Sequence, residues 1–258
     1  MNTGMSEISI VTFNTWNCQG RFPRRLPLMV AGLESLQADV ILLQEVFAQA
    51  PTGMHAGERL ADALGMSLSY LPARKKLRKL NGSPILSHSG LGILSKSPIL
   101  KSRSVRLPQD DRDGERLGQC VTLNVQGVAL QIGNIHLTHL PDSDALRRQQ
   151  LQTVANELSD DADLTIVGGD MNAPYGHSIF EVLEGFSTPC FMEGLPTSSL
   201  NPIDGGEFTA GVVDHLFARP APGRDIAWHA RLALDDRDVQ TGLYPSDHKA
   251  LVVRMTVK

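Results

Sequence analysis

One segment of the sequence, Asp163-Leu-Thr-Ile-Val-Gly-Gly-Asp170-Met-Asn172-Ala-Pro174, combines a predicted buried strand with polar side chains that suit catalysis. The apolar and β-branched run 164–167 predicts the strand, and the two glycines after it let the backbone pass close to a neighbouring segment. On an extended backbone Asp170 and Asn172 would point to the same side. Asp170 could then accept a proton from water, and Asn172 could hold that water or a phosphate oxygen. The alternative is an Asx turn that ends the strand.

The composition is that of a globular protein with enough material for a large core. Of the 258 residues, 41% are hydrophobic and 20% are charged, and neither a repeat nor a linker interrupts the chain. We therefore expect one domain over 1–258, with a core of about 7–257. The net charge of −4 excludes a globally basic nucleic-acid binder but allows a local basic patch. No apolar run reaches the roughly 20 residues of a membrane span, and no signal-peptide pattern is present at the N-terminus.

Three cysteines, Cys18, Cys120 and Cys190, lie far apart and outside any Cys-x-x-Cys pattern. We expect them to be unpaired thiols in a reducing compartment, which favours a cytoplasmic protein. Nothing in the sequence implies a stable protein partner, and we expect a monomer.

Predicted strands alternate with helices in the first half of the chain, and strands dominate the middle and the end. The spacing of apolar residues predicts helices over 24–37, 57–64 and 178–183, and a further helix capped by Ser143. Other strands are predicted over 8–13, 39–46, 90–96, 99–107, 117–125, 128–137, 212–217, 226–234 and 249–257. Gln126-Gly127 is a predicted hairpin turn, and residues 186–210 are predicted to form a surface loop near the site.

Polar side chains stand at the ends of these predicted strands, or inside one in the case of Asp214. They are Asn14, Glu45, His136, Asp170 with Asn172, Asp214, and Asp247 with His248. Oxygen ligands of this kind suit a hard cation such as Mg²⁺, and Mn²⁺ would fit the same ligands. A zinc site is disfavoured, because no Cys takes part and no His pair has HExxH-like spacing. Taken alone, Glu45 also fits a surface glutamate at a strand exit, and His136 a buried, hydrogen-bonded histidine.

Residues 74–79 read Arg-Lys-Lys-Leu-Arg-Lys, which places five basic residues in six positions. The surrounding segment contains Gly, Ser and Pro and predicts a loop. This basic run is either an electrostatic contact for a polyanion or a solvated loop without a ligand. Tyr70 is the only aromatic residue nearby in the sequence, so base stacking is not expected. If the substrate is a nucleic acid, we therefore expect cleavage without sequence preference.

Six short motifs, spread over almost the whole chain, resemble those of the endonuclease/exonuclease/phosphatase superfamily of metal-dependent hydrolases. In order they are Thr12-Phe-Asn14-Thr-Trp, Leu43-Gln-Glu45-Val, Asn134-Ile-His136-Leu, Gly169-Asp170-Met-Asn172, Val213-Asp214-His-Leu-Phe and Ser246-Asp247-His248. The superfamily includes pancreatic-type deoxyribonuclease, apurinic endonucleases, neutral sphingomyelinases and inositol polyphosphate 5-phosphatases. The resemblance implies an α/β fold, a four-layer α/β/β/α sandwich of two packed mixed sheets with outer helices, and catalytic loops along one edge.

The resemblance also implies a metal site and a site for the attacking water. Glu45 would be the main ligand of Mg²⁺, with Asn14 and Asp247 as further ligands, although Asn14 would alternatively contact the phosphate. Asp170 would orient or deprotonate the attacking water. Asn172 would hold the scissile phosphate.

Two histidines and one more aspartate complete the implied catalytic set. His248 would face the phosphoryl group, and Asp247 would fix the tautomer of His248. His136 would be a further contact to the substrate. Asp214 would either help His136 or approach the metal. Which group acts as the general base stays open. His136 stands where apurinic endonucleases have a Pro-Asn type segment, so repair of abasic sites is disfavoured. His215, where many members carry an aromatic residue, is interpreted as a neighbour of the site and not as a catalyst.

The function that follows is hydrolysis of a phosphodiester by in-line attack of an activated water, dependent on Mg²⁺ and closest to that of a nuclease. The substrate would be a nucleic acid or, as in sphingomyelinases, a phospholipid headgroup, and small phosphate esters remain an alternative. A catalytically inactive binding protein is the alternative from a different class. The intact set of acids, amides and histidines argues against it.

Overall fold

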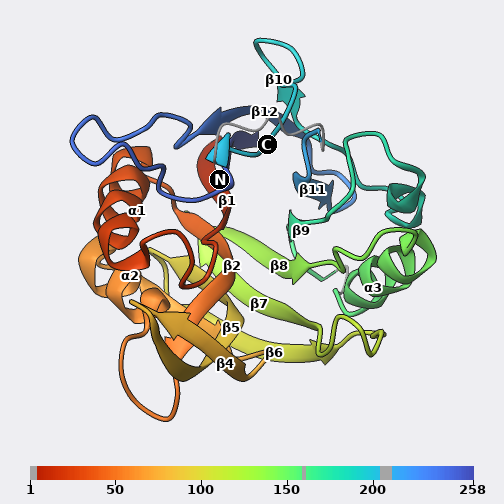
Figure 1. The fold of residues 1–258 in the computed structure, drawn as a ribbon. Helices are drawn as coiled ribbons and strands as arrows, with labels where there is room; N and C mark the ends of the chain where they lie inside the picture. The colour runs from red at the N-terminus through yellow and green to blue at the C-terminus, as the bar shows by residue number, and fades with distance from the viewer. Residues whose placement is uncertain (1–4, 159–160, 204–210) are drawn as a thin grey trace.

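The computed structural model describes residues 5–158, 161–203 and 211–258 (Figure 1). Two β-sheets pack together, and helices lie on the outer face of each sheet. The predicted four-layer sandwich of two mixed sheets is therefore confirmed. None of the helices in these ranges has the length and hydropathy that crossing a membrane requires.

Both sheets mix parallel and antiparallel strands. The first sheet has the order β10 (Cys190–Phe191), β12 (Ile226–Ala233), β13 (Ala250–Val257), β1 (Ser6–Asn14), β2 (Val40–Gln49), β5 (Ser83–Ser95) and β3 (Ser67–Leu71), and β4 (Lys76–Leu80) pairs with the N-terminal part of β5. The second sheet has the order β11 (Asp214–Pro220), β9 (Leu164–Asp170), β8 (Val128–His136), β7 (Leu117–Val125) and β6 (Ile99–Arg106). The parallel pairs are β1–β2, β8–β9 and β10–β12.

Three apolar layers hold the sandwich together. Between the sheets, Leu42 of β2 and Ile132 of β8 belong to one buried cluster. The helices α1 (Phe22–Leu36) and α2 (Ala56–Leu64) cover the first sheet through residues such as Met29, and α3 (Asp144–Asn156) with the 3-10 helix η1 (Ser178–Val182) covers the second through residues such as Leu151. These four residues are 0% exposed, and burial of such a side chain contributes about 1.5–3 kcal/mol.

A buried polar contact joins the two sheets between the middle of β2 and the end of β8. Gln44 Nε2 donates to Asn134 Oδ1 at 2.8 Å and to Thr12 Oγ1 at 3.1 Å. Asn134 Nδ2 donates to the backbone oxygens of Leu43 and Gly92 at 3.0 and 3.1 Å. Since buried polar groups are costly unless paired, these bonds are satisfied only when the two strands keep this relative position.

Several sequence expectations about the elements were right in kind and wrong in detail. The basic run 74–79 is not a loop, because Lys76–Leu80 forms β4 and pairs with β5 around the turn Asn81-Gly82. β5 therefore begins at Ser83 and not at Gly90. The hairpin turn at Gln126-Gly127 is confirmed, with φ of 52° and 87°.

Three further expectations need correction. Asp214 is the first residue of β11 and does not lie inside the strand. Ser143 occupies the N-cap position of α3, but its hydroxyl donates to the backbone oxygen of Pro141 and does not cap the helix. Of the predicted loop 186–210, residues 190–191 form β10, and residues 204–210 lie outside the described part of the chain.

We predict that Asn134→Ala lowers the free energy of unfolding by more than about 2 kcal/mol, because each buried partner left unpaired costs about 1–3 kcal/mol. The measurement is urea unfolding followed by circular dichroism. Asn124→Ala is the matched control, since Asn124 is exposed on the neighbouring strand β7. Equal stabilities of the two variants would contradict a structural role for the buried contact.

Candidate active site

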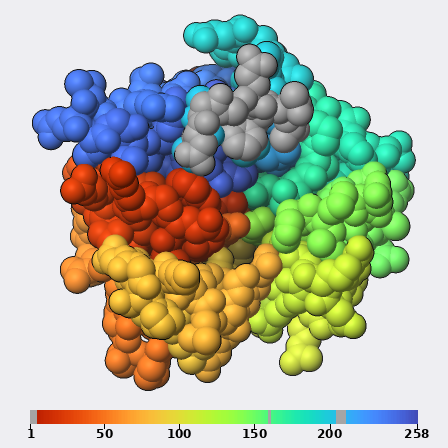
Figure 2. Space-filling model, viewed as in Figure 1, coloured from red at the N-terminus to blue at the C-terminus, as the bar shows by residue number. Residues whose placement is uncertain are grey.

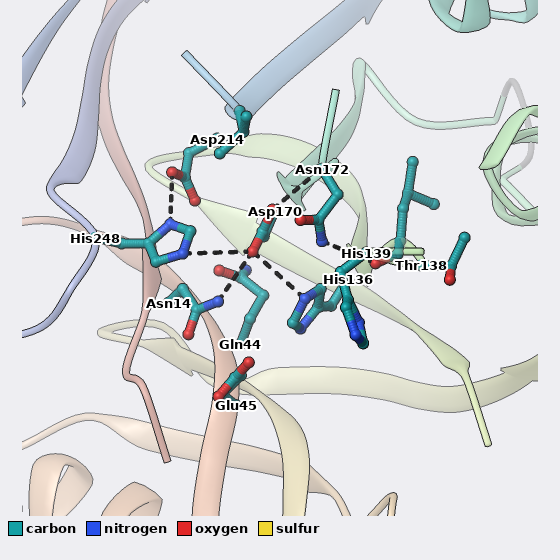
Figure 3. A network of polar contacts seen from close by, with 12 residues as sticks. Asn14, Gln44, Glu45, His136, Thr138, His139, Asp170, Asn172, Asp214 and His248 are labelled. Carbon is teal, nitrogen blue, oxygen red and sulfur yellow. Dashed lines mark hydrogen bonds and ion pairs between the residues drawn. The ribbon is translucent and has the colours of Figure 1, made fainter. Parts of the chain in front are cut away.

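The pairing of three neighbouring strands brings the predicted catalytic residues together. Asp170 ends β9, and the parallel register places His136 of β8 beside it. On the other side, the antiparallel register pairs Asp170 with Asp214, the first residue of β11. All three side chains lie at the same edge of the second sheet (Figure 3). Asp170 and Asp214 are buried, at 2% and 0% exposure.

Gly169 makes the close approach of β9 to β8 sterically possible. Its φ is 140°, and a Cβ atom at this position would lie 1.8 Å from the backbone oxygen of Ile135. Beyond it the backbone turns, because Asn172 has a φ of 46° and its N–H donates to Asp170 Oδ1 at 3.0 Å. The extended backbone expected for Asp170 and Asn172 is therefore wrong, and the Asx turn and the predicted site residues coincide. Asn172 Nδ2 donates to the backbone oxygen of Leu137.

One carboxylate oxygen of Asp170 is the meeting point of the site. Asn14 Nδ2 donates to Asp170 Oδ2 at 3.0 Å. His136 Nε2 lies 3.4 Å and His248 Nε2 lies 3.7 Å from the same oxygen. Figure 3 shows these contacts as dashed lines that converge on Asp170. Residues from β1, β8, β9 and the segment before β13 thus meet at one atom.

The partner of the His248 imidazole is Asp214. His248 Nδ1 lies 2.9 Å from Asp214 Oδ2, and Ser199 Oγ donates to the same oxygen at 2.7 Å. The expectation that Asp247 fixes the tautomer of His248 is therefore wrong. Asp214 contacts neither His136 nor Asp247 through any hydrogen bond or ion pair within the described residues.

Burial and neighbouring charges set the protonation of these groups. Burial alone would lower the pKa of His248, but the charges of Asp214 and Asp170 prevail and raise that pKa well above its ordinary value. Burial raises the pKa of Asp170 to about 6, against the opposing effect of His248. Burial, reinforced by Arg116, lowers the pKa of His136 well below its ordinary value. At neutral pH the site thus combines an imidazolium, a neutral imidazole and an ionised carboxylate.

Glu45 owes its orientation to a β-bulge. The register between β2 and β5 shifts between Leu43 and Val46, so that Gln44 and Glu45 stand opposite the single residue Leu91. Glu45 has a φ of 53°, an uncommon conformation for a residue with a side chain, and Asn17 Nδ2 donates to its carboxylate. Since β2 continues to Gln49, Glu45 is not at the end of the strand as the sequence suggested.

Asp247 is held on the Glu45 side of the site. Ser246 Oγ donates to the backbone oxygen of Asn14 at 2.7 Å and lies 3.1 Å from Asp247 Oδ1. Burial raises the pKa of Asp247 to about 6, His248 opposes that rise, and the charge of Glu45 adds to it. Two carboxylates that repel each other in this way are the arrangement that a divalent cation stabilises.

Glu45, Asn14 and Asp247 carry oxygen ligands of the type that a hard divalent cation takes, and the charge of Glu45 acts on Asp247. A second group, Asp170, Asp214 and His248, has ligand atoms within 4.8 Å of one another. This second group suits a metal less well, because both ring nitrogens of His248 face carboxylates and the raised pKa keeps the ring protonated. We therefore place the ion-pair network at Asp170 and the candidate metal ligands beside it.

Asp113 and Arg116 form a buried ion pair that sequence analysis missed. Arg116 Nε and Nη2 contact the carboxylate of Asp113 at 2.7 and 2.9 Å, and Nη1 donates to the backbone oxygen of His136. Arg74 Nη2 and His139 Nδ1 approach the same carboxylate at 3.1 and 3.4 Å. Burial alone would raise the pKa of Asp113, but the bonds to Arg116 and the charge of Arg74 lower it below its ordinary value.

Arg25 is a second residue that the sequence did not reveal. Its guanidinium is buried and donates to the backbone oxygens of Thr15, Trp16, Asn17, Gln19, Gly20 and Pro245. These bonds join the segment after Asn14 to the segment before Asp247. An arginine at helical spacing among apolar residues of α1 carries no signal of this role, because its hydrogen-bond acceptors are all backbone atoms.

The family model for the Endonuclease/Exonuclease/phosphatase family matches residues 14–248, from the first predicted site residue to the last. The chain belongs to this family. Membership makes it a phosphoester hydrolase by class, in a family whose enzymes generally depend on a divalent metal. No curated protein matches the sequence.

Solved structures of the family share the fold. An endonuclease/exonuclease/phosphatase from Beutenbergia cavernae is 20% identical, with a TM-score of 0.69 over 96% of this chain and 71% of that chain. TDP2 from Caenorhabditis elegans is 16% identical, with a TM-score of 0.71 over 96% and 75%. A mannosyl-6-phosphatase from Bacteroides thetaiotaomicron is 16% identical, with a TM-score of 0.70 over 96% and 99%. At these identities the similarity shows the fold alone.

We predict that Asp113→Asn lowers the free energy of unfolding by about 3–5 kcal/mol at pH 7, because it leaves a buried guanidinium without its counter-charge. The folded-state pKa of Asp113 is depressed, so its contribution is complete above the unfolded pKa and is lost as pH falls through the folded value. The difference between wild type and variant should therefore be constant above about pH 5 and shrink below about pH 4.

The measurement is urea unfolding between pH 7 and pH 3.5. Asp110→Asn is the control, because Asp110 pairs with Arg112 on the surface, and this variant should leave the stability nearly unchanged at pH 7. A stability difference for Asp113→Asn that does not depend on pH would contradict the assignment of the shift to this ion pair.

Proposed function

We propose that the protein is a Mg²⁺-dependent phosphodiesterase that uses in-line attack of a water molecule on phosphorus. The observation that carries the proposal is the convergence of Asn14, His136 and His248 on one oxygen of Asp170. Charged groups arranged before the substrate arrives stabilise charge that develops in a transition state. The candidate metal ligands Glu45 and Asp247 lie on the adjoining side of the same site.

Asp170 is the group best suited to accept a proton from the attacking water. Its pKa of about 6 leaves it ionised at neutral pH, yet makes it more basic than an ordinary aspartate. His248 is unsuited to this task, because it is already protonated, and His136 is held neutral in a cationic surrounding. As the water oxygen bonds to phosphorus, the bond to the leaving oxygen breaks, and that oxygen takes the electron pair and then a proton from solvent.

The remaining residues would bind and polarise the phosphate. His248 would donate Nε2–H to a phosphate oxygen, and Asp214 would hold the ring in place through Nδ1. Asn172 would donate its second amide hydrogen, the first being bonded to the oxygen of Leu137. Mg²⁺ bound by Glu45, Asn14 and Asp247 would neutralise phosphate charge and stabilise the leaving oxygen.

A nuclease-like substrate is supported by the basic run 74–79, which lies in the same part of the fold as Glu45. The similarity to a structure named a mannosyl-6-phosphatase supports the wider class of phosphoester chemistry. Comparing the rates at which bis-p-nitrophenyl phosphate and p-nitrophenyl phosphate are hydrolysed tests whether the enzyme prefers diesters or monoesters. We expect faster hydrolysis of the diester in Mg²⁺, none in EDTA, and a large loss of rate in Asp170→Asn. Hydrolysis that persists in EDTA, or that favours the monoester, would overturn this proposal.

We predict that Asp214→Asn and Asp247→Asn impair the enzyme in different ways. Asp214→Asn should lower kcat on bis-p-nitrophenyl phosphate by roughly 10–100-fold with little change in the half-saturating Mg²⁺ concentration, because the imidazole loses its orienting carboxylate. Asp247→Asn should mainly raise the Mg²⁺ concentration needed for half-maximal rate. The measurement is initial rate against Mg²⁺ concentration. The opposite pattern would restore the expectation that Asp247 orients His248.

A further inference from the structure

A cavity of about 550 Å³ opens beside Glu45, and no residue of the network around Asp170 lines it. Its walls include Arg74, Lys76, Arg78 and Lys79 from the basic run, together with His139. In Figure 2 the red N-terminal segment, the orange-to-yellow segment and the green segment meet around a depression near the centre of the view. Four of the five basic residues in the run 74–79 thus lie beside the candidate metal ligand and not on a distant surface, and Lys75 is the exception.

The four basic residues of the run 74–79 that line the cavity differ in whether the protein itself binds their charged groups. Arg78 donates to the backbone and side-chain oxygens of Ser87 and to the backbone oxygen of Arg74, so it supports the hairpin. Arg74 forms an ion pair with Asp113. In contrast, within the described ranges the ammonium groups of Lys76 and Lys79 have neither a hydrogen bond nor an ion pair. Lys76 and Lys79 are therefore the two basic residues of the lining whose ammonium groups are not paired with an acid, although the charges of Glu45 and Asp113 act on Lys76 from farther away.

The charges in this wall repel one another. Burial lowers the pKa of Lys76, the neighbouring charges of Arg74 and Arg78 lower it further, and the charges of Glu45 and Asp113 oppose this only in part. Among the described residues that line the cavity, Glu45 is the single acid, and its carboxylate belongs to the candidate metal site. An anion bound in the cavity would relieve this repulsion, whereas a cationic headgroup such as choline would increase it.

We propose that this cavity binds a second phosphate group of the substrate, next to the phosphate that is cleaved. The inference deepens the proposed function and rests on it, because the scissile phosphate must lie between Asp170 and Glu45 for the cavity to adjoin it. The volume falls in the range of about 300–1,000 Å³ typical of ligand pockets, so a phosphate together with the group that carries it would fit. Lys76 and Lys79 would supply the contacts to its oxygens.

The test compares two chromogenic esters that differ by one phosphate. They are the p-nitrophenyl ester of thymidine 5′-phosphate and the same ester with an added 3′-phosphate, assayed at one fixed ionic strength with Mg²⁺. We expect the added phosphate to raise kcat/KM about tenfold or more in the wild-type enzyme, mainly through KM. In the double variant Lys76→Gln, Lys79→Gln this ratio should fall to about one.

The matched control is the double variant Lys75→Gln, Lys101→Gln, which removes the same charge from exposed lysines outside the cavity and should keep the wild-type ratio. A wild-type ratio near one, or an equal fall in both double variants, would overturn the inference. Calorimetric binding of thymidine 3′,5′-bisphosphate against thymidine 5′-phosphate gives a second readout. This experiment measures how much the second phosphate adds to binding affinity, even when neither ester is cleaved. It therefore separates failure of this inference from failure of the proposed function.

Assay of a third substrate, an oligothymidylate, shows whether the second phosphate belongs to a nucleic-acid chain or to a small bisphosphate. If the cavity variant loses activity on both the oligomer and the bisphosphate ester, the pocket is supported, and the substrate with the higher kcat/KM in wild type identifies the source. A loss confined to the oligomer would mean diffuse attraction of a polyanion by the hairpin and would overturn the pocket.

Discussion

The pairing register of β9 with β8 and β11 is the constraint on which the rest of the site depends. It places His136 and Asp214 on either side of Asp170, and a shift by one residue would turn all three side chains to opposite faces. Gly169 permits this register because any side chain there would collide with the backbone of Ile135. Asn134 of the second sheet is buried beside Gln44 of the first sheet, and the hydrogen bond between them holds the two sheets in position. The geometry of the catalytic edge is thus a consequence of strand pairing.

Charge burial explains why these residues are held so tightly. Asp170, Asp214 and His248 are almost inaccessible to water, and each would be costly to bury alone. Together they form a paired network in which the imidazolium separates two carboxylates. The pair Asp113 and Arg116 repeats the principle on the other side of His136, where it contributes to keeping that ring neutral. Adjacent histidines in one site therefore carry different charges because their neighbours differ.

Apolar runs and polar strand ends are local patterns, and they predicted most of the strands and the candidate site residues, whereas the four-layer sandwich was implied by the resemblance of six motifs to the family. The sequence did not predict which acid meets which histidine, because the pairing of His248 with Asp214 depends on how strands far apart in sequence align. The bulge that turns Glu45 inward left no local signal either. The hairpin of β4 and β5 did leave one: Asn81-Gly82 is a favoured two-residue turn, which the surrounding polar residues obscured. The role of Arg25 was hidden because its hydrogen bonds go only to backbone oxygens.

We propose that the two sides of the site have different tasks, with the metal held on the Glu45 side and the proton accepted on the Asp170 side. Titration of the protein with Mn²⁺, followed by electron paramagnetic resonance, tests this division most directly and needs no substrate. We expect Glu45→Gln to weaken Mn²⁺ binding by about tenfold or more, whereas Asp170→Asn should bind Mn²⁺ much as wild type does and yet fail to turn over substrate. Strong loss of Mn²⁺ binding in Asp170→Asn with little loss in Glu45→Gln would contradict it.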